Sequence, residues 1–147
     1  MGKILIRSYK PEDETQILDL WIQCGLVVPQ NNPKKDIERK LKVNPELFLV
    51  GILENKIVAS CMAGYEGHRG WINYLAVSPQ CRRRGFAADM MKAAEYRLRE
   101  MGCPKINLQI RASNQETIKF YKSIGFSDDH VLSMAKRLEQ DEPYKVT

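Results

Sequence analysis

Apolar positions along the chain follow two different periods, and the changes between them predict alternating strands and helices. Two apolar runs of strand length, residues 47–53 and 57–65, flank the polar stretch Glu54-Asn55-Lys56 and predict an antiparallel hairpin. The other expected strands are residues 3–9, 71–77, 106–111 and 131–137. Helical spacing predicts helices over residues 11–25, 36–43, 87–102 and 113–124. This order of elements is typical of an α/β sheet of mixed direction.

Several expected boundaries have a local signal. Residues 29–33, with the sequence PQNNP, predict a loop before the second helix. Gly102 followed by Pro104 predicts the end of the third helix. Ser113 with Glu116 three residues later predicts a capping box at the start of the fourth.

Length and charge limit the classes of function. The 147 residues favour one domain, residues 1–147, with a polar tail over about 139–147. The formal net charge is +5, but most basic residues alternate with acids, as in residues 34–40, which is typical of a solvated helix face. The exception is the uncompensated run of three arginines, residues 82–84. We therefore predict a local anion site and no nucleic-acid partner.

The chain also lacks membrane and metal signals. Its first residues contain too short an apolar run for a secretory signal, and no run approaches the roughly 20 apolar residues of a membrane-spanning helix. We expect a cytoplasmic protein with no membrane partner. Four widely spaced cysteines and two histidines do not predict a metal site. Reduced thiols packed as small apolar side chains are expected instead.

The most informative segment joins the strand at 71–77 to the helix that follows it. It reads VSPQCRRRGFA over residues 77–87. The first turn of a helix has unpaired backbone N–H groups and the positive end of the helix dipole, so it attracts anions. Gly85 lets the backbone approach a ligand closely, and arginine side chains can contact phosphate oxygens. The two phosphate-loop patterns GxxxxGK[ST] and GxGxxG are absent.

The remaining pattern, R-x-x-G-x-A over residues 82–87, resembles the pyrophosphate loop of the GNAT (Gcn5-related N-acetyltransferase) family. A second segment, NQETIKFYKSIGF from Asn114 to Phe126, looks like the second motif of that family, with Ile118 where a small residue is common. The resemblance covers residues 4–138, and several loops look like the bacterial YpeA-like branch. It implies a mostly antiparallel central sheet of about six to seven strands, helices on both faces, and a splay between the fourth and fifth strands.

The same resemblance implies acetyl-CoA as co-substrate and no metal. The exposed strand edge at residues 75–77 would hold the pantetheine arm, and one N–H near Leu75 would polarise the thioester carbonyl. The loop at residues 82–87 would hold the pyrophosphate. The residues implied to bind the cofactor are Leu75, Ala76, Val77, Arg82, Arg83, Arg84, Gly85, Phe86, Ala87 and Asn114.

Tyr121 is implied to donate a proton to the departing CoA thiolate. A free phenol has a pKa of about 10 and a thiol of about 8.5, so this contribution is expected to be modest. Where related N-terminal acetyltransferases carry a glutamate, this chain has Gln109, which cannot act as a base. Glu66 and His68 remain as candidate bases, and each has a plausible structural role in the loop.

The acceptor pocket is implied to lie around Trp21, residues 27–33 and residues 36–39. Asp36 either pairs with a cationic amine or forms an ion pair with Lys40, four residues on. The leading function is acetyl transfer to a primary amine of a small molecule or a protein, by direct attack in a ternary complex. The alternative is a non-catalytic acyl-CoA-binding sensor. The acceptor stays unidentified, and the protein is expected to be a monomer or a homodimer.

Overall fold

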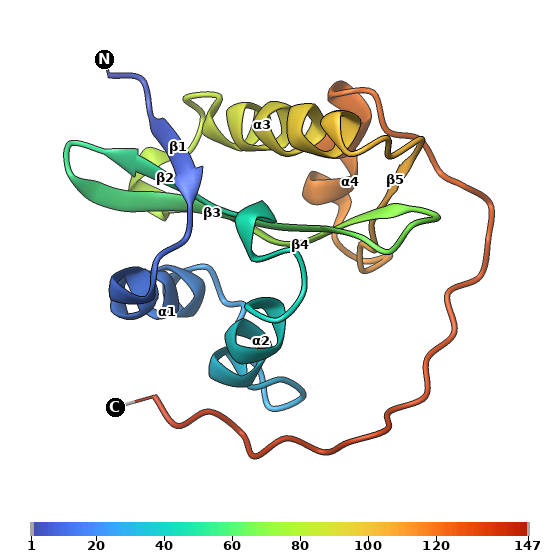
Figure 1. Cartoon of the computed structure of the whole chain (residues 1–147), viewed down its shortest axis with the longest axis horizontal. Helices are drawn as coiled ribbons and strands as arrows, with labels where there is room; N and C mark the ends of the chain where they lie inside the picture. Colours follow the sequence, from blue (N-terminus) through green and yellow to red (C-terminus); the bar gives the residue numbers. More distant parts are fainter. Residues whose placement is uncertain (1, 147) are drawn as a thin grey trace. The chain divides into compact units, whose positions relative to one another are not determined.

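The computed structural model describes residues 2–146, which divide into two compact units (Figure 1). The first contains residues 2–107 together with 141–146, and the second contains residues 108–140. In residues 2–146 no helix has both the length and the apolar character that crossing a bilayer requires.

The first unit is built on a five-stranded sheet with the order β1-β2-β3-β4-β5. The strands are β1 (Leu5–Ser8), β2 (Phe48–Leu53), β3 (Lys56–Tyr65), β4 (Gly70–Val77) and β5 (Ile106–Asn107). Neighbours from β1 to β4 are antiparallel, and β5 is parallel to β4. The expected hairpin is present: Leu53 pairs with Lys56, and the two residues between them, Glu54 and Asn55, have φ of 50° and 66°. Left-handed backbone at both turn residues is typical of the type I′ turn of a two-residue hairpin.

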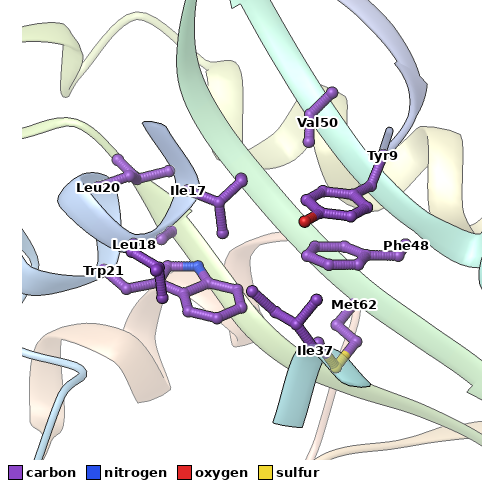
Figure 2. Close-up of a cluster of buried hydrophobic side chains, with 10 residues drawn as sticks. Tyr9, Ile17, Leu18, Leu20, Trp21, Ile37, Phe48, Val50 and Met62 are labelled. Atoms are coloured by element: carbon purple, nitrogen blue, oxygen red, sulfur yellow. The ribbon is translucent and has the colours of Figure 1, made fainter. Parts of the chain in front are cut away.

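Helices lie on both faces of this sheet, with α1 (Glu14–Gln23) and α2 (Pro33–Lys40) on one face and α3 (Phe86–Glu100) on the other (Figure 1). The strand alternation of β2 explains the two faces. Phe48 and Val50 belong to a core cluster with Ile17 and Trp21 of α1 (Figure 2). Gly51, which points the other way, lies so close to Met90 of α3 that an added Cβ would be 2.9 Å from its sulfur.

The first unit also contains three short 3₁₀ turns that connect these elements. They are η1 (Pro11–Asp13), η2 (Pro45–Leu47) and η3 (Pro79–Cys81). Helix α2 begins at Pro33 rather than at residue 36, because the side chain of Asn32 accepts hydrogen bonds from the N–H groups of Lys34 and Lys35. The segment that we predicted as a loop through residue 33 therefore supplies the cap and the first turn of the helix.

The second unit contains α4 (Gln115–Ser123). Its N-cap is Asn114, whose side chain accepts a hydrogen bond from the Thr117 N–H at 3.2 Å, so the capping residue is Asn114 and not Ser113 as predicted. Helix α4 ends at Ser123, before Gly125, which has φ of 104°.

The sheet has fewer strands than the expected six to seven. Residues 108–111 do not extend β5, which pairs with β4 only through Ile106 and Asn107. Residues 131–137 form no strand, and their large apolar side chains are exposed, with Leu132 at 84%. Apolar alternation predicts a strand only where a neighbouring strand takes up its N–H and C=O groups. The mixed α/β class with helices on both faces of the sheet is confirmed.

Candidate active site

The joint between β4 and α3 is a tight turn anchored by apolar side chains at both ends. Cys81 at its start and Phe86 at its end are buried in one cluster with Val58 of β3. Between them the backbone takes two left-handed conformations, with φ of 64° at Arg83 and 82° at Gly85. Residues 82–85 are therefore exposed, while the buried side chains of Cys81 and Phe86 hold the two ends of the turn in place.

Helix α3 begins at this turn without a capping side chain. Its N-cap is Gly85, whose carbonyl accepts the first helical hydrogen bond, from Asp89 at 3.0 Å. The N–H groups of Phe86 and Ala87 precede that bond and have no acceptor within the helix. They form a positively polarised nest at the end of a helix of 15 residues.

The three arginines add charge to this nest. Arg82, Arg83 and Arg84 are exposed, and none forms an ion pair within residues 2–146. Arg82 turns back so that its Nε lies 3.4 Å from the Val77 carbonyl oxygen. The single acid of the first helical turn is Asp89. The predicted loop residues 82–87 thus lie together around one helix N-terminus, which suits a phosphate-bearing ligand.

The strand edge beside this loop is open. Pairing between β4 and β5 ends at Trp71, so residues 72–77 of β4 have no strand partner on that side within the described chain. On the other side, Ser78 donates its N–H to Val58 at 2.7 Å and Ala76 pairs with Ser60 of β3. Strand alternation then directs the N–H groups of Leu75 and Val77 toward the open edge.

A bulge at Tyr74 interrupts β4 just before these residues. The register of β3 and β4 shifts between Ser60 and Met62, and Tyr74 has φ of 51°, which is rare for an aromatic residue. The bulge is held by its side chain: the ring stacks on Trp21 with centroids 3.9 Å apart. The Tyr74 carbonyl accepts from Ser60 Oγ at 2.7 Å, and Ser60 in turn accepts from the indole of Trp21 at 2.9 Å.

A hollow of about 400 Å³ lies beside the bulge on the α1 and α2 side of the sheet. The residues that line it come from α2, β3 and β4: Asp36, Arg39, Lys40, Met62, Asn73 and Tyr74. The phenol of Tyr74 donates to Asp36 Oδ2 at 2.6 Å and accepts from the amide of Asn31. Burial and the neighbouring Asp36 raise the pKa of Tyr74 above its ordinary value.

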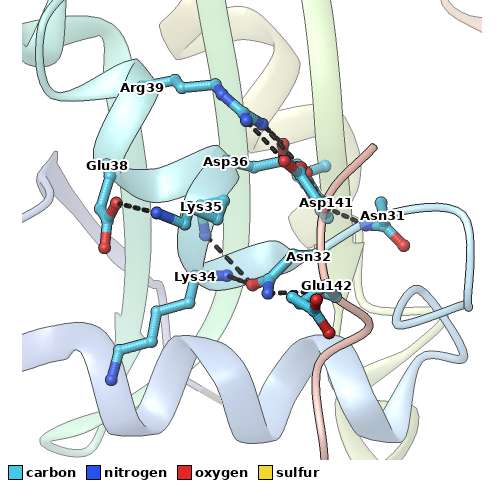
Figure 3. A network of polar contacts seen from close by, with 10 residues as sticks. Asn31, Asn32, Lys34, Lys35, Asp36, Glu38, Arg39, Asp141 and Glu142 are labelled. Atoms are coloured by element: carbon cyan, nitrogen blue, oxygen red, sulfur yellow. Dashed lines mark hydrogen bonds and ion pairs between the residues drawn. The ribbon is translucent and has the colours of Figure 1, made fainter. Parts of the chain in front are cut away.

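The C-terminal segment crosses α2 beside the hollow (Figure 3). Arg39 donates to both carboxylate oxygens of Asp141, at 2.8 and 2.6 Å, and lies 3.5 Å from Asp36. Asn32 donates to the Glu142 carbonyl at 2.7 Å. Asp36 therefore pairs with Arg39, and the expected ion pair with Lys40 is wrong. The Lys40 ammonium instead donates to the Ala63 carbonyl of β3, because the side chain turns in under the helix.

Glu66 lies in the loop between β3 and β4, and its carboxylate holds the loop together. It accepts hydrogen bonds from the backbone N–H groups of Arg69 and His68, which lower its pKa. The carboxylate is exposed, and it is a weaker base than an ordinary glutamate. His68 is exposed, with its ring beside the Arg69 guanidinium.

In the second unit, Tyr121 is 7% exposed. Its ring meets Phe120 and Phe126 edge-on, with centroids 5.1 and 5.4 Å away. Asn114, predicted as a cofactor residue, caps α4, and Gln109 donates to the hydroxyl of Ser133.

The sequence predicted the loop at residues 82–87 and the open strand edge at residues 75–77. It did not predict the bulge at Tyr74, and it placed Lys40 in an ion pair with Asp36. The sequence gives little sign of a bulge, because a Tyr in an apolar strand predicts ordinary extended backbone. No group of three or more His, Cys, Asp or Glu side chains placed to hold a metal ion occurs within the described residues.

A mixed sheet with an uncapped, positively polarised helix N-terminus beside an open strand edge is a domain suited to an extended, phosphorylated ligand. Comparison with known proteins names the class. The profile of the acetyltransferase (GNAT) family matches residues 8–126, and the chain belongs to this family. It is 42% identical to an acetyltransferase of Sodalis glossinidius over 140 residues, 95% of this chain and 99% of that one. It is 41% identical over 139 residues to an acetyltransferase of Yersinia pestis, with the same coverage.

Solved structures share the fold. Ard1 from Thermoplasma volcanium has a TM-score of 0.74 at 24% identity, covering 86% of this chain and 84% of that one. AAC(6')-Iy in complex with the bisubstrate analog CoA-S-monomethyl-acetylneamine has a TM-score of 0.74 at 17% identity, covering 92% and 99%. The family match is consistent with an acetyltransferase, and these structures support the fold alone.

Proposed function

We propose that this protein transfers the acetyl group of acetyl-CoA to a primary amine, by direct attack in a ternary complex. The observation that carries the proposal is the uncapped N-terminus of α3, with its three exposed arginines, next to the open edge of β4. A diphosphate needs several donors and positive charge, and a pantetheine arm has amides that pair with a strand edge. Both features lie in the first unit, joined by eight residues of chain from Ser78 to Gly85.

In this proposal the backbone of Leu75, Ala76 and Val77 aligns the pantetheine arm. The outward N–H of Leu75 donates to the thioester oxygen as negative charge develops on it. The bulge at Tyr74 sets where that N–H points, and the stacked Trp21 keeps the bulge in place. The Val77 carbonyl already accepts contacts from Cys24 and Arg82, so it is not proposed to bind the pantetheine arm.

The arginines and the nest receive the phosphates. In this proposal a diphosphate oxygen accepts from the N–H groups of Phe86 and Ala87, which have no acceptor within the first turn of α3. Arg82, Arg83 and Arg84 supply charge around it. We retain Asn114 as a proposed contributor to the cofactor site through its place at the start of α4.

The chemical step forms a carbon–nitrogen bond and breaks the carbon–sulfur bond of the thioester. Tyr121 is the proposed donor of the proton that the departing thiolate takes up. Its ring meets Phe120 and Phe126 edge-on, and these contacts restrict the direction in which the phenol points. Glu66 is the proposed group that receives the amine proton, through water. Its lowered pKa makes this contribution small.

The test is an acetyl-transfer assay with a panel of amines, amino acids and peptide N-termini as acceptors. The reaction is measured by the release of the CoA thiol, and the product is identified by its mass. Acetylated product that requires both acetyl-CoA and protein supports the proposal. Tight acetyl-CoA binding without transfer to any acceptor would instead favour a CoA-binding sensor, because the base position at Gln109 carries an amide.

A further inference from the structure

The hollow beside Tyr74 is where the structure gives information about the acceptor. Its floor is the sheet, at Met62, Asn73 and Tyr74, and its wall is α2. Tyr74 directly precedes Leu75, whose N–H points to the open edge of β4. A molecule in this hollow therefore contacts the residue that directly precedes the N–H proposed to bind the thioester oxygen. The volume of about 400 Å³ is in the range of small-molecule sites.

Two of the three charged side chains that line the hollow are already paired. The Asp36 carboxylate accepts the Tyr74 hydroxyl at 2.6 Å and lies 3.5 Å from Arg39. Arg39 is also bound by both oxygens of Asp141, whose side chain is 9% exposed. These two acids and one arginine form one connected network (Figure 3).

Lys40 is different. Its ammonium donates to the Ala63 carbonyl, and it forms no ion pair within residues 2–146. It is partly buried, and burial lowers its pKa although the nearby Glu46 carboxylate acts in the opposite direction. The chain makes room for it: a Cβ on Gly64 would lie 3.3 Å from the Lys40 Nζ. An ammonium has three donors, and a partly buried cation that forms no ion pair is costly unless a ligand supplies the opposite charge at close range.

We infer that the acceptor of this acetyltransferase is an amine that also carries an anionic group, and that Lys40 binds this group in the hollow. The inference rests on the proposed function. The amine end reaches the thioester at the edge of β4 while the anionic end stays against α2. A polycationic acceptor is disfavoured, because it would bring further positive charge to a hollow whose lining carboxylate, Asp36, is already paired with Tyr74 and Arg39.

The experiment compares acceptors that differ only in the anionic group. We pair 4-aminobutyrate with butylamine for a carboxylate, and phosphoethanolamine with ethanolamine for a phosphate. Wild-type protein should use at least one anionic member with kcat/KM at least 10-fold above its neutral partner. Lys40→Met, which keeps the length of the side chain, should raise KM for that acceptor about 10-fold or more and remove the preference. Lys40→Arg should restore part of it.

Lys56→Met is the matched control, since Lys56 is an exposed lysine at the start of β3 and does not line the hollow. It should leave the preference unchanged. A purely structural role of Lys40 would lower the melting temperature of Lys40→Met and leave the ratio between paired acceptors as in wild type. That result, or equal use of both members of each pair, overturns the inference.

A binding measurement separates this inference from the proposed function. Each anionic amine is added to the protein in the presence of CoA, and the melting temperature is recorded. An increase in wild type that is absent in Lys40→Met supports the anion site even if no acetyl group is transferred, in which case the proposed function fails alone. If the protein transfers acetyl groups and neither turnover nor binding depends on Lys40, the proposed function stands and this inference fails.

Discussion

Replacing Gly85 with aspartate tests the proposed phosphate nest most directly. Gly85 has φ of 82°, and no atom from elsewhere in the described chain lies within 4 Å of the Cβ that a side chain would add. The substitution therefore introduces no clash. It introduces backbone strain and one negative charge at the mouth of α3, and these two effects can be measured separately.

The strain can be estimated from the backbone. A left-handed conformation costs a residue with a Cβ about 1–2 kcal/mol. For a chain of 147 residues, this lowers the melting temperature by roughly 3–6 °C. The aspartate substitution should lower the melting temperature less than the alanine substitution does. Aspartate tolerates the left-handed conformation better, and its charge is favourable at a helix N-terminus. Without ligand, Gly85→Asp should thus be at least as stable as Gly85→Ala.

The charge acts on the ligand. Acetyl-CoA at 100 times its Kd stabilises a folded protein by about 2.7 kcal/mol. Two like charges about 4 Å apart near a protein surface repel by about 4 kcal/mol, which weakens binding about 10³-fold. The same ligand concentration then stabilises Gly85→Asp by less than about 0.1 kcal/mol. Thermal unfolding should show the full ligand-induced increase for wild type, a smaller increase for Gly85→Ala, whose methyl group limits the close approach of the ligand, and none for Gly85→Asp.

Gly102 offers a matched control. It has φ of 84° and equally open surroundings, but it follows the C-terminal end of α3. Gly102→Asp carries similar backbone strain and should keep the full effect of acetyl-CoA. If Gly85→Asp retains that effect, or if Gly102→Asp loses it to the same extent, the ligand does not bind at the mouth of α3.

Three further changes test other parts of the structure. Tyr121→Phe should lower kcat on the order of 10²-fold with little change in the acetyl-CoA KM, because the ring keeps its aromatic contacts; an unchanged kcat excludes Tyr121 as the acid. Glu66→Gln should lower kcat/KM by less than the roughly 10²-fold usual for a general base, since its pKa is lowered, and a larger loss in steady-state assays would contradict that reading. Asp13 is buried, which opposes ionisation, but hydrogen bonds from Arg7 and the Lys10 N–H lower its pKa overall. Asp13→Asn should cost about 2 kcal/mol in urea unfolding at pH 7. This difference should shrink as the pH falls below about 4 toward the folded-state pKa of Asp13, and a difference that grows on acidification would show the sign to be wrong.

Local signals were enough to predict most elements of the first unit. The turn between β2 and β3 depends on two adjacent residues, and the ends of α1 and α3 depend on proline and glycine at fixed positions. The N-terminus of α3 could also be predicted from a local signal, because the three arginines, Gly85 and the first helical turn are consecutive in sequence. Short-range sequence patterns are reliable where the physical cause is also short-range.

The errors lie where the cause is distant in sequence. Residues 131–137 have the alternation of a strand, but pairing depends on a partner that the pattern does not contain. Asp36 and Lys40 have the spacing of a helical ion pair, yet Asp36 meets Tyr74, 38 residues on, and Lys40 meets Ala63, 23 residues on. Helical spacing describes one helix surface and says nothing about the strand beneath it.

Tyr74 contributes both to the strand edge that is proposed to bind the thioester and to the hollow that is proposed to bind the acceptor. A change at one of these two places can therefore affect the other. Its backbone bulge directs the neighbouring Leu75 N–H toward the open edge, while its hydroxyl binds Asp36 in the wall of the hollow. The ring between them is fixed by Trp21. A change of acceptor specificity made at Asp36 would therefore be transmitted to the strand edge that is proposed to bind the thioester. Lys40 lies in the same hollow but bonds to β3 rather than to the bulge, so it can alter acceptor preference while that edge stays in place.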